Sequence, residues 1–424
     1  MEPVKSHAMK GCSWIVCFGV SMAACAETNC PSPTTPTPPS AETPTKDGAF
    51  GSHVACELDR AKLHASGASD ALLKELGKSP FRYFRALAPQ YEARTCHEFE
   101  DLRWRLPVAA VHGDAHLEQF VVTGQTFGLE DFDRAGLGPA VVDLVRYASS
   151  LRIVCRDLRC ENPDTVVDRF LDAYRASLDA APTKTEPRIV ERLRAKAPQT
   201  RGEWLAWADS LLKPLDATRA ESARADWGTF EAVLRELHPG RPATEFALVR
   251  VGSLSMGIGS ALEDKLLFRS NGPTSSPDDD QILEAREGEF PDPKAAGCIW
   301  RGSHGDSLVL MFMEILGRRM PDLHGFLPIA GPMSRDYWVQ SWDPGYQELS
   351  ASDLASEQEL TEVAVDAARQ LAGHFWQKDP EPVRVHQRRA QLAAFDLTRD
   401  RADALSRTLA AETLAGYGRF IASP

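Results

Sequence analysis

The sequence has no apolar run long enough to cross a membrane, because its longest candidate, residues 11–24, falls short of the roughly 20 residues that a span requires. Basic residues are also few: 48 Lys and Arg stand against 60 Asp and Glu among 424 residues, a formal net charge of −12. Such an acidic surface repels phosphate backbones and argues against nucleic acid as a partner. The sequence contains no Cys-x-x-Cys pair, so a structural zinc site has little support.

The N-terminus has the features of an export signal. Lys5 and Lys10 precede the apolar run, which ends in small residues at 23–26. A basic start, a short apolar core and small residues at a cleavage point are typical of secretory signals. Residues 22–25 also resemble the lipobox of bacterial lipoproteins, with Cys25 as the lipidated residue. We therefore expect residues 1–26 to be a signal peptide, simply cleaved or of the lipoprotein type. The protein would be periplasmic, or a lipoprotein held on the membrane only through Cys25.

The remaining chain divides by composition and pattern. Residues 27–50 are predicted to be a disordered, solvated linker, because their central part is almost entirely Pro, Thr, Ser and Ala. Helical periodicity follows over 51–240, strand-like runs between Gly-, Asp- and Pro-rich turns over 241–345, and helical periodicity again over 346–424. This order predicts an α+β fold with a helical lobe and a β-rich lobe.

The cysteines allow disulfide bonds if the protein is exported. Cys56–Cys96 and Cys155–Cys160 are two pairings compatible with the sequence. Spacing alone does not decide the connectivity, so both stay open.

Two acidic loops carry the most informative pattern. A predicted strand at 108–111 leads into His-Gly-Asp-Ala-His-Leu-Glu-Gln at 112–119, and two short predicted strands lead to Glu-Asp-Phe-Asp at 130–133. Phosphoryl transfer needs one Asp to orient or deprotonate the attacking hydroxyl. It needs a second Asp to hold magnesium, together with an amide five residues after the first. We therefore predict Asp114 as the catalytic base, with Asp131, Gln119 and Asp133 as ligands of Mg²⁺.

This pattern resembles the catalytic and metal-binding loops of aminoglycoside and choline phosphotransferases, with Gln119 in place of their usual Asn. The resemblance implies a protein-kinase-like fold in which Asp143, on the following helix, braces the catalytic loop. The chain is more similar still to the bacterial domain-of-unknown-function family numbered 2252. That similarity rests on Ser-Pro-Phe-Arg-Tyr-Phe-Arg at 79–85, the two acidic loops, Val-Gly-Ser at 251–253 and Leu-Ala-Gly-His at 371–374.

A glycine-rich stretch follows the predicted strand at 246–251, without the Gly-Lys-Ser/Thr of a Walker loop. Glycine lets backbone N–H groups approach phosphates closely, although a plain β-turn is the simpler interpretation. The residues predicted to hold the phosphates of ATP are Gly252, Ser253, Gly257 and Gly259.

The cation that kinases place on a later strand gives a further prediction. By the resemblance, that strand is 281–285 and the position falls on Arg286, with Lys265 as the alternative. Trp338 and Trp342 lie on the predicted hinge strand between the lobes, where they can stack on a base.

The order of the parts indicates a circular permutation. In ordinary kinases the glycine-rich lobe comes first, whereas here the catalytic loop precedes the β-rich lobe. The resemblance therefore predicts a permuted, two-lobed kinase-like fold with residues 337–344 as the hinge.

Three functions remain open at this point. The first is a kinase-like phosphotransferase that uses Mg²⁺ and ATP on an unidentified acceptor. Because ATP is scarce outside the cytoplasm, a non-catalytic kinase-like module that binds a small molecule or nucleotide is the second. The third is a metal-dependent hydrolase that uses His112, Asp114 and His116.

Overall fold

The computed structural model describes most of the chain from residue 56 to residue 423. The residues inside this range that are not described are 67, 125, 183–184, 199, 255–263, 288–296, 302–305, 318–319, 328–336 and 377–380. The signal peptide, Cys25, the linker, Gly257 and Gly259 all lie outside the described residues. The chain divides into the units 1–46 and 47–424, and the second is the one described below.

The helical lobe is assembled from the two ends of this unit. Its helices are α1 (Arg60–Ala65), α2 (Asp70–Leu76), α3 (Pro80–Arg85), α4 (Ala88–Glu98), α5 (Val141–Leu158), α6 (Pro163–Asp179), α7 (Ile189–Lys196), α11 (Glu357–Gly373) and α12 (Glu381–Ala422). Its strands form two small antiparallel sheets, β1 (Val108–Val111) with β4 (Gly136–Pro139), and β2 (Phe120–Thr123) with β3 (Thr126–Leu129) and β11 (Gln347–Glu348).

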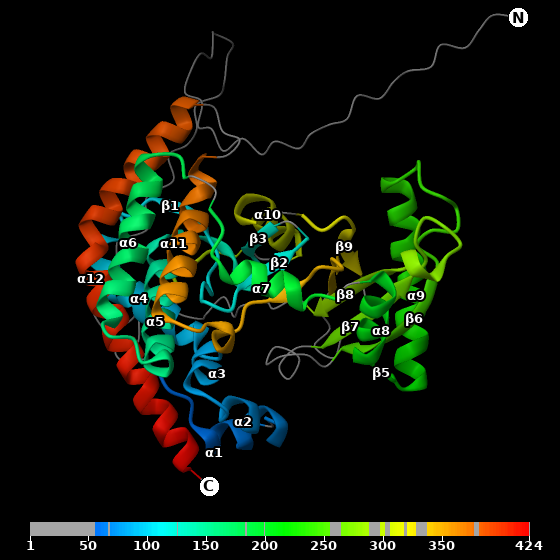
Figure 1. The fold of residues 1–424 in the computed structure, drawn as a ribbon, viewed down its shortest axis with the longest axis horizontal. Coiled ribbons are helices and arrows are strands. Elements are labelled where there is room, and N and C mark those ends of the chain that lie inside the picture. The colour runs from blue at the N-terminus through cyan, green and yellow to red at the C-terminus, as the bar shows by residue number, and fades with distance from the viewer. Residues whose placement is uncertain are drawn as a thin grey trace, which may run out of the picture. The chain divides into compact units, whose positions relative to one another are not determined.

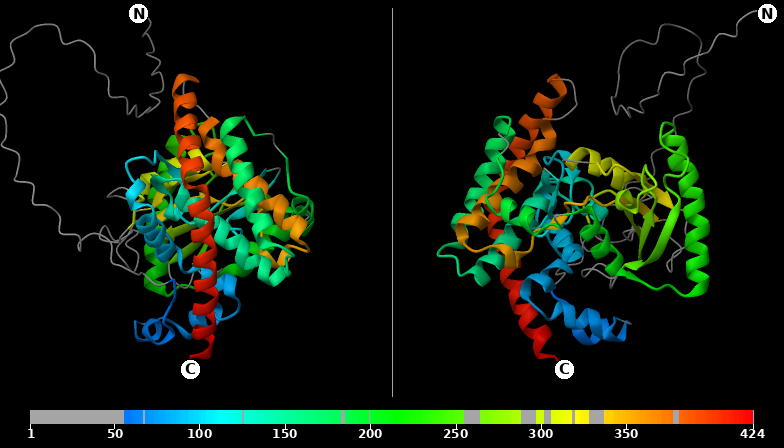
Figure 2. Two further views of the ribbon diagram at one scale, coloured as in Figure 1. Left: turned by 90° about the vertical axis from the view of Figure 1, so that its left-hand side faces the viewer. Right: turned by 45° about the vertical axis from the view of Figure 1, so that its right-hand side comes forward.

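Helix α5 is the centre of the helical lobe. Every residue of α5 from Val141 to Cys155 is buried. A helix that is covered on all sides must be surrounded by other elements. Helices α4, α6 and α12 pack around it, and α12 runs along the lobe in both Figure 1 and Figure 2. The acidic residue at the start of α5, Asp143, is therefore held in the core of the lobe.

The β-rich lobe is a six-stranded antiparallel sheet in the order β5-β6-β7-β8-β10-β9. Its strands are β5 (Leu212–Lys213), β6 (Leu248–Leu254), β7 (Lys265–Ser270), β8 (Gln281–Glu287), β9 (His324–Leu327) and β10 (Tyr337–Ser341). Helix α9 (Ala217–Leu237) packs on one face through Trp227 and Phe230, and α8 (Arg201–Leu211) packs on the other through Trp204 and Leu205.

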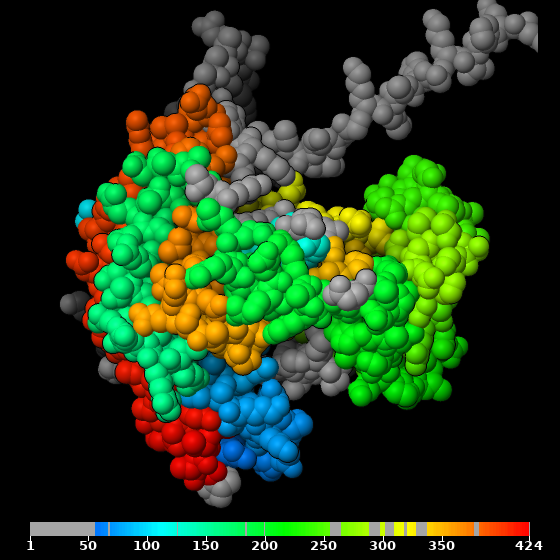
Figure 3. Space-filling model, viewed as in Figure 1, coloured from blue at the N-terminus to red at the C-terminus, as the bar shows by residue number. Residues whose placement is uncertain are grey.

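Helix α10 (Asp306–Leu316) follows β8 in the chain but packs into the core of the helical lobe. Its buried residues Phe312, Met313 and Leu316 belong to that core, and the helix contacts β1 and the turn at 132–134. Figure 3 shows the surface of the molecule from the side of Figure 1, with the segment after β10, in orange, between the green β-rich lobe and the helical lobe.

The α+β class predicted from the sequence is confirmed, since helices and antiparallel sheets make up the described unit. Among its described residues, no helix combines the length and the apolar character that a membrane span requires.

One of the two cysteine pairings left open by the sequence is confirmed and the other is wrong. Cys155 and Cys160 form a disulfide, but Cys96 bonds Cys298, with a Cα–Cα distance of 5.5 Å, and Cys56 is a buried free thiol. The reason is that α4 ends beside the segment 297–301, which pairs with β4 through Leu137 and Trp300.

Gly252 gives a first prediction. A Cβ at this position would lie 2.5 Å from the carbonyl oxygen of Lys213 and 3.0 Å from Leu212. Gly252→Ala therefore pushes β5 off the sheet, and we expect a loss of about 1–3 kcal/mol of unfolding free energy in chemical denaturation. Gly240→Ala is the matched control, because a Cβ there meets no atom within 4 Å. Equal stability of the two variants would contradict the packing role of Gly252.

Candidate functional site

The loop that carries Asp114 is fixed by one buried carboxylate. Asp143 accepts the backbone N–H groups of His112 at 2.7 Å and of Gly113 at 2.8 Å. The bracing role that the resemblance implied for Asp143 is confirmed by these bonds. Gly113 itself has φ +75°, and a Cβ there would lie 2.1 Å from the carbonyl oxygen of Arg134. Only glycine therefore permits the two acidic loops to lie this close.

Asp114 is held by a second residue of α5. The Nε and Nη2 atoms of Arg146 lie 2.9 Å and 2.8 Å from Asp114 Oδ1. Arg146 is 2% exposed, stacks on the ring of Phe84 at 3.7 Å, and donates to the carbonyl oxygens of Phe84 and Arg85 at the end of α3. These bonds fix the orientation of the Asp114 carboxylate and turn its other oxygen, Oδ2, toward His116.

The two histidines of the loop support its shape. His112 Nδ1 accepts the N–H of Asp114 at 3.4 Å, and its Nε2 bonds the carbonyl oxygen of Glu130 at 2.8 Å. Burial, followed by the positive charge of Arg85, keeps the pKa of His116 well below its usual value, so this ring is neutral. Its Nδ1 accepts the N–H of Glu118 at 3.2 Å, which leaves the proton on Nε2, 3.8 Å from Asp114 Oδ2.

The second acidic loop meets a cation from the β-rich lobe. Arg286 on β8 lies 2.6 Å from Asp131 Oδ1, 3.3 Å from Asp133 Oδ2 and 2.7 Å from Glu284 Oε1. Gln119 donates to Asp131 Oδ2 at 3.4 Å. The predicted magnesium ligands Gln119, Asp131 and Asp133 are thus brought together, and the predicted phosphate-binding Arg286 lies among them.

The charges in this cluster determine its protonation. Burial opposes ionisation of Asp131, but Arg286 and Lys265 outweigh it and hold the pKa of Asp131 below its usual range. Burial likewise disfavours the charged form of Arg286, yet Glu284, Asp131 and Asp133 raise its pKa well above the ordinary value. Asp131 and Arg286 are therefore both ionised at neutral pH. Asp131 also has a left-handed backbone (φ 66°), a conformation that Asp tolerates better than most residues.

The electrostatic surroundings of His116 include residues of both acidic loops. Its ring lies 3.8 Å from Asp114, and the negative charge of Asp131 acts on its pKa. Asp114 and Asp131 therefore belong to one electrostatic cluster rather than to unrelated surfaces.

The residues present fit a magnesium site in which substrate phosphates supply part of the coordination. Mg²⁺ is usually held by one or two carboxylates, water and substrate phosphates rather than by a complete protein cage. Asp131, Asp133 and Gln119 supply oxygen ligands, and their carboxylates already converge on a positive charge, that of Arg286. Within the described residues, no group of three or more His, Cys, Asp or Glu side chains could hold a metal by itself.

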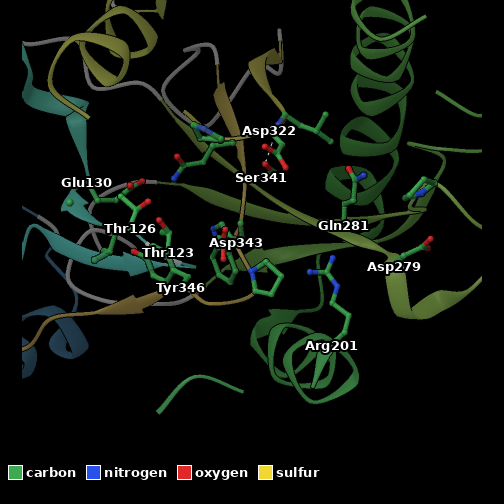
Figure 4. Close-up of a pocket in the computed structure, with 18 of the residues that line it drawn as sticks. Thr123, Thr126, Glu130, Arg201, Asp279, Gln281, Asp322, Ser341, Asp343 and Tyr346 are labelled. Carbon is green, nitrogen blue, oxygen red and sulfur yellow. Dashed lines mark hydrogen bonds between the residues drawn. The ribbon is translucent and has the colours of Figure 1, made fainter. Parts of the chain in front are cut away.

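A cavity of about 490 Å³ lies beside this cluster, at the segment that joins the lobes. Figure 4 shows Glu130, Tyr346 and Asp343 on one side of it and Gln281 and Arg201 on the other. Trp342 and Tyr346 both line the cavity, and their rings stack with centroids 6.2 Å apart.

Glu130, the residue before Asp131, and Gln340 both line this cavity. The Gln340 side chain hydrogen-bonds the Glu130 carboxylate, while burial raises the pKa of Glu130 to about 7. Gln340 is 4% exposed, and its Oε1 atom has no hydrogen-bond partner. The cavity thus offers stacked rings and a buried acceptor to a small ligand.

The predicted phosphate-binding glycine segment is described only in part. Gly252 and Ser253 lie in β6, where Ser253 pairs with Lys213 and Leu266. The group that lies close to Gly252 is the backbone of Lys213. Lys265, the alternative cation, pairs with Arg286 across β7 and β8 and acts on the pKa of Asp131.

Several residues of the site were missed by sequence reasoning. Arg146, Glu284 and Gln340 are all buried. Arg146 and Glu284 contact the predicted residues Asp114 and Arg286, and Gln340 contacts Glu130, the residue before Asp131. For Arg146 a signal was present, because it lies one helical turn after Asp143 and so shares its face of α5. Glu284 shares a strand face with Arg286, two positions away.

Comparison with known proteins covers part of the chain. Residues 71–226 match the family described as "Uncharacterized protein conserved in bacteria (DUF2252)". This match supports the predicted family resemblance over the segment that contains both acidic loops and α5. No curated protein and no solved structure matches the chain.

The brace made by Asp143 is testable. Asp143→Ala leaves two buried N–H groups without their charged acceptor, and each such bond contributes about 1.5–3 kcal/mol. We expect chemical denaturation to show a loss of at least about 2 kcal/mol. Asp157→Ala, at an exposed position of the same helix, should change stability by less than about 0.5 kcal/mol. Similar losses in the two variants would argue against the brace.

Proposed function

We propose that the protein is a magnesium-dependent phosphotransferase with a kinase-like core. The observation that carries this proposal is the meeting of Asp131, Asp133 and Gln119 with Arg286 from a different lobe. Kinases place a metal-binding Asp, an amide ligand and a basic residue of the third strand around the nucleotide phosphates. Here Arg286 lies on β8, the third strand when β6 is counted as the first, and the glycine-rich stretch begins in β6 and precedes β7 in the sequence.

The arrangement of α10 gives further support. In kinases a helix follows the third strand and must be placed correctly beside the metal-binding loop. Helix α10 follows β8 and contacts the turn at 132–134. The chain then passes through β9 and β10 to the segment that joins the lobes. The order of these elements supports a kinase-like fold that is circularly permuted, since the acidic loops precede the sheet in the sequence.

The proposed roles follow from the contacts. Asp114 Oδ2 accepts the proton of an acceptor hydroxyl, while Arg146 holds Oδ1. Asp131, Asp133 and Gln119 hold the magnesium ion, which when bound neutralises charge on the transferred phosphoryl group. Arg286 and Lys265 hold phosphates, and the cavity lined by Trp342 and Tyr346 takes the organic part of the ligand. The proposal includes export by the predicted signal peptide, so the enzyme would act outside the cytoplasm.

A non-catalytic kinase-like binding module is the second candidate. Two observations favour it: Arg286 is already engaged by three carboxylates, and the backbone of Lys213 covers Gly252. The hydrolase alternative has less support, because both ring nitrogens of His112 are used within the loop region.

Nucleotide binding tests the proposal. With MgCl₂ and ATP at about 100 times the dissociation constant, binding adds about 2.7 kcal/mol to the stability of the native protein. We expect the midpoint temperature of thermal unfolding to rise by several degrees for the wild type and for Asp114→Asn, but not for Asp131→Asn. Asp157→Asn is the control and should behave as the wild type.

Turnover separates the two candidates. A phosphotransferase consumes ATP in the wild type and loses most of this activity in Asp114→Asn, although binding is kept. If the wild type binds nucleotide but a broad panel of hydroxyl acceptors yields no turnover, the binding module is correct. If no nucleotide changes the thermal stability, the phosphotransferase fails and a module that binds another small molecule is favoured.

Arg286 should compete with a metal for the same carboxylates. Arg286→Gln leaves buried carboxylates without their cation, and we expect a loss of about 3–5 kcal/mol of stability. Mn²⁺ at millimolar concentration should restore stability to this variant more than it stabilises the wild type. Arg269→Gln is the matched control, because Arg269 on β7 also pairs with two carboxylates, Asp209 and Asp280. Equal recovery of both variants with Mn²⁺ would refute a specific metal site at Asp131.

A further inference from the structure

We infer that Arg301 and the Cys96–Cys298 disulfide form a clamp that fixes the two acidic loops against each other, so that reduction of this disulfide loosens both loops. Arg301 is thus a positioning residue rather than a catalytic one. The inference concerns the loops themselves, and it rests on the proposed function only for its consequence, a weaker cation site.

Arg301 touches both loops and the helix beneath them. Its Nε donates to the carbonyl oxygen of Arg134 at 2.8 Å, directly after Asp133. Its two Nη atoms lie 3.1 Å and 2.7 Å from the carboxylate oxygens of Glu92 on α4. Nη2 also lies 3.0 Å from the place where a Cβ of Gly113 would be, so the guanidinium abuts the loop of Asp114.

The ion pair between Arg301 and Glu92 is buried, so its geometry is tightly restricted. The side chains of Arg301 and Glu92 are 9% and 4% exposed. A buried ion pair holds its geometry well, because either charge alone in that position is unfavourable. The planar guanidinium of arginine can donate to both oxygens of Glu92 and to the Arg134 carbonyl at the same time. The single ammonium group of a lysine could not reproduce this geometry.

The disulfide holds the segment that presents Arg301. Cys298 is bonded to Cys96 near the end of α4, and its N–H lies 2.8 Å from the Cys96 sulfur. Two residues later, Trp300 exchanges backbone hydrogen bonds of 2.9 Å and 2.8 Å with Leu137 of β4. The bond joins residues 202 positions apart, so it restricts a very long stretch of chain.

The disulfide can be reached from outside. A cavity of about 370 Å³ is lined by Cys96 and Cys298 together with Phe99, Val108 and Trp300. Val108 and Trp300 are 71% and 59% exposed at its rim. A small dithiol can therefore attack one sulfur as a thiolate and form a mixed disulfide. Its second thiol then displaces the protein, which leaves both cysteines as thiols and the reagent as a cyclic disulfide.

The test uses the full-length double variant Cys155→Ser/Cys160→Ser, in which Cys96–Cys298 is the disulfide that remains among the described residues. Hydrogen–deuterium exchange is compared before and after reduction with dithiothreitol. We expect exchange to rise roughly tenfold or more in peptides covering 108–119 and 129–139, because both loops lose a fixed support. Peptides of α9, in the β-rich lobe, should not change. Unchanged exchange in both loops would overturn the inference, and so would a rise throughout the protein.

Arg301→Gln provides an independent check under oxidising conditions. It should raise exchange in the same two peptides, whereas Arg175→Gln, which breaks the exposed ion pair with Asp396, should not. Mn²⁺ binding to the oxidised and reduced protein measures the consequence at Asp131, and we expect it to weaken about tenfold on reduction. Absence of Mn²⁺ binding in the oxidised protein would count against the proposed function alone, because the exchange measurement needs no ligand.

Discussion

The charge on Arg286 is the constraint on which the site depends. Three carboxylates, those of Asp131, Asp133 and Glu284, lie within 3.3 Å of its nitrogen atoms in a largely buried region. Such a group of acids is stable only beside a positive charge, because burial strongly penalises each isolated anion. Since Arg286 belongs to the sheet and Asp131 to the helical lobe, this one cation also couples the two lobes electrostatically.

Helix α5 plays the corresponding part for Asp114. Asp143 holds the backbone of the loop, and Arg146, one turn later, holds the side chain of Asp114. Because this part of α5 is buried on all sides, neither residue can move without disturbing the core. Besides their shared contact with Arg301, the two acidic loops are held in different ways: one by a central helix, and the other by a charge that arrives from the sheet.

The sequence predicted the parts of the site that depend on local spacing. Asp114, Gln119 and Asp131 lie in two short stretches whose order is itself informative, and the bracing Asp143 lies in the first turn of the helix that follows them. It predicted less where charged residues are buried, since the strand expected over 281–285 in fact continues to Glu287 with Arg286 inside it. It also could not show that Cys96 meets Cys298, because a contact across 202 residues depends on the packing of the whole lobe.

Because Arg286 is already paired with three carboxylates, an anionic ligand can bind it only by replacing some of these ion pairs. A phosphate that takes Arg286 draws this cation away from Asp131 and Asp133, which weakens the electrostatic compensation of two acids in a largely buried region. A divalent ion bound at those acids in the same event restores the balance. Neither the phosphate nor the metal is then favourable alone, whereas the two together replace one set of ion pairs by another of equal charge. Under the proposed function, this exchange would account for an arginine that lies between the proposed metal ligands.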